Sequence, residues 1–134
     1  MFGKYPVTLG LLFLAAAPAN GATLYKCKLD VTKNNHIIPA QLYIEHDSQT
    51  GQAQVMDPFI NYYVGKPMDA EVSADNDKRL TVAWSFENIE SREGQNIPRV
   101  RVRATVLKAT HEAHVTVSFG NGDSESGFGA CTVE

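Results

Sequence analysis

Apolar and polar side chains alternate with a period of two along almost the whole chain after residue 22. β-Branched and aromatic residues carry the alternation, and clusters of Gly, Asn, Asp and Pro interrupt it. This pattern predicts half-buried β-strands separated by turns, and helical periodicity is almost absent. The short connections favour antiparallel neighbours. The expected strands lie at about residues 23–30, 40–47, 52–57, 59–64, 69–74, 79–88, 98–108, 112–119 and 126–133.

The segment "PRVRVRATVLKATHEAHVTVSFG" predicts a hairpin whose register can be tested. With its turn around residues 109 and 110, the apolar pairs would be Val106–Ala113, Ala104–Val115, Val102–Val117 and Val100–Phe119. A slip of one residue would move every one of these side chains to the other face. By the same reasoning Phe86 should face Val100, and Glu87 should face Arg99 on the outside. In the turn that contains Gly51, Asp47 should pair with Gln52, which sets Ile44 opposite Val55.

The first 22 residues read as a secretory signal peptide. A short start with Lys4 precedes an apolar run from Val7 to Ala17, and small residues follow. The leader should be cleaved after Ala19 or Ala22, which leaves one β-domain at residues 23–134 in the periplasm or outside the cell. Because the apolar run is about half of the ~20 residues that span a bilayer, no stable membrane insertion is expected.

The chain has two cysteines, Cys27 near the start of the expected domain and Cys131 near its end. In an exported domain such a pair is expected to form one disulfide. The bond would close a loop of roughly 100 residues, which the chain-entropy estimate values at about 4–5 kcal/mol. The cysteines therefore predict a covalent link between the first and last strands.

The last strand contains a conflict between parity and hydrophobicity. Phe128 and Cys131 point to opposite faces of a regular strand, although both residue types are commonly buried. A β-bulge between Gly127 and Gly129 would bring both side chains inside. Together these features predict an all-β fold in which a single antiparallel meander of about eight strands forms a small β-barrel or a β-sandwich.

The net charge of the chain argues against nucleic acid and anionic membranes as partners. The formal net charge of the chain is −3, and loss of Lys4 with the leader makes the domain more acidic. An acidic domain has no overall electrostatic attraction to nucleic acid or to an anionic membrane.

Two groups of side chains are candidates for binding. Arg99, Arg101 and Arg103 form a basic stripe on one strand face, suited to carboxylates or phosphates or else simply solvated and paired with acids. The segment "DPFINYYVGKP" concentrates Phe59, Tyr62 and Tyr63, which could anchor an interface, line a pocket or pack in the core.

Signals for metal binding and catalysis are weak. In "HEAH" the imidazoles of His111 and His114 would point to opposite faces of a strand, which does not match a metal site. No nucleophile elbow, phosphate-binding glycine loop or cofactor motif is present in the sequence. We therefore expect no catalysis, no cofactor and no metal.

The function predicted from these residues is an exported binding module for a protein, an anionic envelope component or an enzyme that it inhibits. The alternative is a carrier of a small hydrophobic ligand inside a lipocalin-like barrel, although Trp84, Phe86, Phe119 and Phe128 look sufficient to fill the interior. A hydrolase is the remote third alternative. The expected shape resembles that of small disulfide-linked periplasmic β-barrels, among them lysozyme inhibitors and lipocalin-like proteins, without a motif shared residue by residue.

Overall fold

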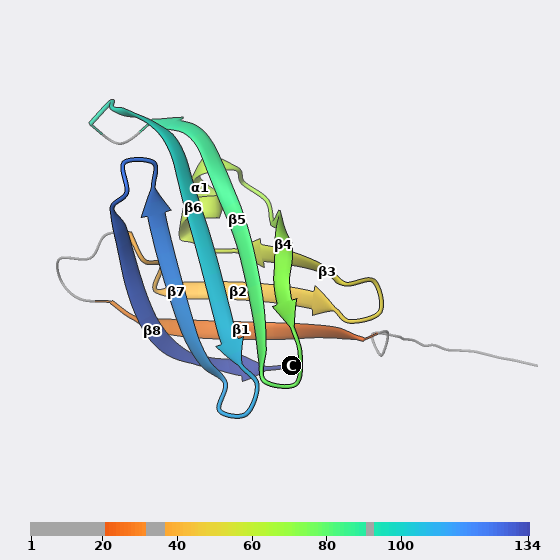
Figure 1. Ribbon diagram of the computed structural model, residues 1–134. Coiled ribbons are helices and arrows are strands. Elements are labelled where there is room, and N and C mark those ends of the chain that lie inside the picture. Colours follow the sequence, from red (N-terminus) through yellow and green to blue (C-terminus); the bar gives the residue numbers. More distant parts are fainter. Residues whose placement is uncertain (1–20, 32–36, 91–92) are drawn as a thin grey trace, which may run out of the picture.

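The computed structural model describes residues 21–31, 37–90 and 93–134 as a closed antiparallel β-barrel (Figure 1). Strands adjacent in sequence are adjacent in the barrel, and β8 returns to pair with β1. The elements are β1 (Ala22–Asp30), β2 (Gln41–Asp47), β3 (Gln52–Met56), α1 (Pro58–Tyr63), β4 (Met68–Asp75), β5 (Arg79–Glu90), β6 (Asn96–Leu107), β7 (Glu112–Phe119) and β8 (Ser124–Val133). The barrel, rather than the sandwich, is therefore the correct architecture.

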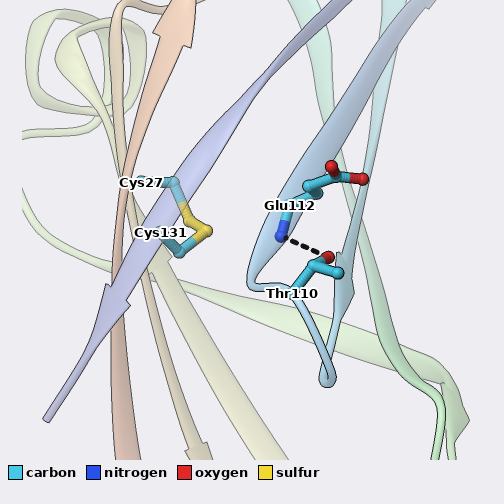
Figure 2. Close-up of a disulfide and its surroundings, with 4 residues drawn as sticks. All are labelled: Cys27, Thr110, Glu112 and Cys131. Carbon is cyan, nitrogen blue, oxygen red and sulfur yellow. Dashed lines mark hydrogen bonds between the residues drawn. A yellow bond between two sulfur atoms is a disulfide. The ribbon is translucent and has the colours of Figure 1, made fainter.

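The predicted disulfide joins β1 to β8. Cys27 and Cys131 lie directly opposite each other in this strand pair, 104 residues apart in sequence, and both are buried. Figure 2 shows the bond beside the turn between β6 and β7, where the Thr110 hydroxyl accepts a hydrogen bond of 3.2 Å from the amide of Glu112. The carbonyl of His111 in the same turn accepts a bond of 2.8 Å from the amide of Cys131. β8 is thus linked to β1 on one side and hydrogen-bonded to the turn between β6 and β7 on the other.

Alternating side chains of the strands, together with Ile60 of α1, fill the barrel. The largest fully buried side chains are Leu42, Ile44, Val55, Ile60, Leu80, Val82, Val106 and Val115. Burial of apolar surface of this kind is worth roughly 25 cal/mol per Å² and provides the main drive for folding.

The predicted registers are confirmed. The pairing of β6 with β7 sets Val106 opposite Ala113 and continues through the three further pairs to Val100 opposite Phe119. In the β5–β6 pair, Phe86 faces Val100 and Glu87 faces Arg99. In the β2–β3 pair, Ile44 faces Val55.

The predicted strand at residues 59–64 is wrong, because this segment forms the helix α1. The Asp57 carboxylate accepts a hydrogen bond of 2.7 Å from the amide of Ile60, which caps the helix, and Pro58 occupies the first turn. Both residues favour a helix start, Asp by capping free amides and Pro by its fixed φ. The Ile60 side chain is fully buried and anchors the helix on the barrel.

The predicted bulge in β8 is also wrong. Pairing with β1 runs without interruption over residues 128–133 and pairing with β7 over residues 124–130, so Phe128 points outward and is 62% exposed. Gly127 and Gly129 point inward instead. A Cβ on Gly127 would lie 2.7 Å from Ile38 Cγ2, and one on Gly129 would collide with the backbone of Lys28 and Leu29. These glycines permit close packing, and a register shift occurs instead in β4, between Val72 and Ala74.

Residues 1–20 of the predicted leader lie outside the described residues. Its last two residues, Gly21 and Ala22, are described, and Ala22 begins β1. Among the residues that the structure describes, no helix is both long enough and apolar enough to cross a membrane.

Candidate functional site

A cavity of about 130 Å³ lies where α1 meets the barrel, and we call it the mouth cavity. The residues that line it come from distant parts of the sequence: Ile37, Pro39, Asp57, Phe59, Tyr63, Phe86, Ile89, Ile97, Val100, Val102, Val117 and Phe119. Six of them, Ile37, Phe59, Tyr63, Ile89, Ile97 and Phe119, are only half-buried. The cavity is therefore open to solvent at this end of the barrel.

The helix α1 supplies one wall of the mouth cavity. Phe59 and Tyr63 are four residues apart, which places them on the same face of the helix. The ring centroid of Tyr63 lies 6.1 Å from that of Phe86 on β5, and its hydroxyl donates a hydrogen bond of 3.5 Å to the carbonyl of Glu90. The end of the β5–β6 hairpin and α1 are thus in direct contact, as their proximity in Figure 1 indicates.

Among the described residues that line the mouth cavity, Asp57 is the one that carries a charged group. It is 4% exposed. Burial raises the pKa of its carboxyl above the ordinary value, because burial disfavours the charged form, and hydrogen bonds from the amides of Ile60 and Phe59 offset this only in part. Within the described segments Asp57 has no ion-pair partner.

The mouth cavity is suited to one small apolar group. A cavity of ~150 Å³ lined by apolar side chains holds a benzene ring, whereas sites for drug-sized ligands run from about 300 to 1,000 Å³. The lining here has the same apolar character, and its volume of about 130 Å³ lies near the lower figure. A ring, a short branched chain or one side chain of a partner could enter it.

The aromatic candidates from the sequence divide between two locations. Phe59 and Tyr63 line the mouth cavity, while Tyr62 is 68% exposed and contacts Tyr63 edge to face at 4.8 Å between ring centroids. Tyr62 therefore stands on the surface beside the cavity, where an occupant or partner could touch it.

The arginine stripe faces outward from β6, as its parity predicts, and does not meet the aromatic group at the cavity. Arg99 pairs with Glu87 at 2.9 Å, and Arg101 lies 3.8 Å from Glu71. Both pairs are exposed, so each contributes at most about 1 kcal/mol. Arg103 has no acidic partner in the part of the chain that the structure describes.

Sequence reasoning missed Asp57 and treated Phe86 and Phe119 as core filling. The order Asp57–Pro58 was an available signal for a capped helix. Nothing in the sequence indicates that a space remains between side chains from so many segments.

A second surface feature lies on the outer wall of the barrel. The rings of His114 and Phe128 stack at 4.3 Å with an interplanar angle of 8°. They border a groove of about 440 Å³ whose lining also includes Arg79 and Arg103. Across the described residues no group of three His, Cys, Asp or Glu side chains could hold a metal ion.

Comparison with protein-family models, with curated proteins and with solved structures finds no match for this chain.

Proposed function

We propose that this protein is an exported, non-catalytic binding module that holds one small apolar group in the mouth cavity. The observation that carries the proposal is an apolar cavity of about 130 Å³, open at one end of a barrel whose buried apolar side chains form one cluster in the described residues. Water in such a space makes few hydrogen bonds, so an apolar group that replaces it gains free energy on entry.

The size of the mouth cavity favours this proposal over a carrier of large lipids. A lipocalin-like carrier needs a hollow interior, but here the side chains at the centre of the barrel are fully buried. The apolar group could belong to a free small molecule or to a side chain of a partner protein. In the second case Tyr62, exposed beside the cavity, would lie in the interface.

A titration followed by methyl-resolved NMR tests the proposal, with 3,3-dimethyl-1-butanol as the probe. We expect saturable shifts concentrated on the methyl groups of Val100, Val102 and Val117, which line the cavity. The substitution Val117→Phe places a ring in this space and should abolish saturable binding, because the probe would have to overlap it.

Two control variants alter the surface and leave the mouth cavity intact. Leu107→Phe adds the same ring at an exposed position, and Arg101→Ala removes the middle of the arginine stripe. Both should bind the probe like the wild type. The proposal would be refuted if Val117→Phe bound the probe as the wild type does. It would also be refuted if the probe shifted NMR signals over the outer wall of the wild-type barrel, and this second test does not require Val117→Phe to fold.

Export through the leader is part of the proposal, and the oxidised cysteine pair supports it. Cleavage after Ala19 fits the barrel better than cleavage after Ala22. The carbonyl of Gly21 accepts two hydrogen bonds from Ser48, one of 3.1 Å from the amide and one of 3.3 Å from the side-chain hydroxyl. Cleavage after Ala22 would remove both bonds, together with the first residue of β1. We expect the intact mass of the mature protein to show cleavage after Ala19, and a mass showing cleavage after Ala22 would contradict this choice.

A further inference from the structure

The carboxyl of Asp57 is a buried acid beside an apolar space. Asp57 is one of the residues that line the mouth cavity and is 4% exposed, and no basic side chain pairs with it in the described part of the chain. Buried carboxylates are normally paired, because an isolated charge in an apolar environment is costly. The raised pKa of the Asp57 carboxyl reflects this cost. A cation that entered the cavity would supply the missing partner.

Aromatic side chains form much of the remaining lining. Phe59 and Tyr63 on α1, Phe86 on β5 and Phe119 on β7 all border the same space. The faces of aromatic rings carry partial negative charge and attract cations at distances up to about 6 Å from the centroid. A carboxyl and four aromatic rings around one small cavity are therefore suited to a positive group with an apolar surface.

The scarcity of hydrogen-bond acceptors distinguishes between kinds of cation. Among the described lining residues the polar side-chain groups are the Asp57 carboxyl and the Tyr63 hydroxyl, and the latter already donates to the carbonyl of Glu90. A primary ammonium has three N–H donors and is strongly hydrated, so some of its donors would lose their partners inside. A quaternary ammonium has no N–H group, and its methyl groups match the apolar walls.

We propose, building on the function proposed above, that the occupant of the mouth cavity is a quaternary ammonium group, with its methyl groups against the aromatic and aliphatic walls and its charge near the Asp57 carboxylate. The volume of about 130 Å³ suits a single trimethylammonium group, since a benzene ring needs a similar space.

Asp57 also caps α1, and this role alone could explain its burial. Asparagine caps helices about as well as aspartate, so the substitution Asp57→Asn keeps the cap and removes the charge. The two roles can therefore be separated experimentally.

The experiment compares choline with 3,3-dimethyl-1-butanol, which has the same shape but carries carbon in place of the charged nitrogen. Affinities are measured by methyl NMR titration of the wild type and of Asp57→Asn. We expect the wild type to bind choline at least about tenfold more tightly than the neutral compound, as a desolvated cation–π contact and a charge partner together would give. The variant Asp57→Asn should bind choline about tenfold more weakly than the wild type does, and its affinity for the neutral compound should not change.

The outcomes separate the two proposals. If the neutral compound binds and choline binds equally or more weakly, the ammonium inference fails and the mouth cavity remains a binding site. If Asp57→Asn leaves the preference for choline unchanged, the inference also fails. If neither compound binds, the proposed function itself fails. The wild-type comparison is decisive even if Asp57→Asn does not fold.

Vesicles distinguish the sources of a quaternary ammonium group. Binding to phosphatidylcholine vesicles, with no binding to phosphatidylglycerol vesicles, would support the inference with a lipid headgroup as ligand. Choline binding without vesicle binding would support it with a free small molecule as ligand.

Discussion

Replacing both Cys27 and Cys131 with alanine should lower the free energy of unfolding by about 3–5 kcal/mol. The disulfide links residues 104 positions apart, so it restricts almost the whole unfolded domain, and loops of this length give the largest entropic effect. The two side chains are also buried between β1 and β8, which adds a packing loss. Urea denaturation of the wild type and the double variant measures the difference.

Reduction of the wild-type protein provides the control for this experiment. The reduced protein keeps both side chains and loses only the bond, so it should show most of the same loss. If the double variant lost less than about 1 kcal/mol, well below the range typical of native disulfides, the link would not be what closes the barrel.

The second large effect is expected for Gly129→Ala, which should cost about 3 kcal/mol or more. A Cβ at this position would overlap the carbonyl oxygen of Lys28 and the Cα of Leu29, both in the backbone of β1. Because backbone atoms cannot swing aside, β1 and β8 would have to separate where they close the barrel. Thermal or urea denaturation measures the loss.

Gly120→Ala is the matched control for this substitution. Gly120 lies in the turn after β7, and a Cβ there would meet no atom within 4 Å. It should therefore change the stability by less than about 0.5 kcal/mol, as surface substitutions usually do. Similar stabilities for the two variants would show that β1 and β8 are not packed as closely as the structure indicates.

The order and pairing of the strands could be predicted because the two faces of each hairpin differ in polarity. In the β6–β7 hairpin, valines alternate with arginines and polar residues, and only one register keeps Val102 opposite Val117 inside. The expectation of an exported, oxidised domain paired Cys27 with Cys131, and closure followed from their positions near the two ends of the predicted domain.

Two local predictions failed because a general preference was overridden by a specific contact. The aromatic segment at 59–64 has strand-like composition, but the capping carboxylate of Asp57 and the fixed φ of Pro58 start a helix. Phe128 was expected inside because it is aromatic. Close packing at Gly129 keeps β8 regular and leaves the ring outside against His114.

The mouth cavity could not be predicted, since it depends on volumes and not on a motif. Trp84, Phe86 and Phe119 were expected to fill the barrel, and all three are inside or packed against the core. The remaining space arises where α1 lies across the end of the barrel, and α1 itself was read as a strand. Without the helix, neither the burial of Asp57 nor its place in the lining could be anticipated.

Intermolecular nuclear Overhauser effects measure directly where on the protein the bound group lies. With 3,3-dimethyl-1-butanol present at saturation, its tert-butyl protons should show contacts to the methyl groups of Val100, Val102 and Val117 in the mouth cavity. Contacts to Phe128 and His114 on the outer wall, or no contacts at all, would contradict the proposed binding site.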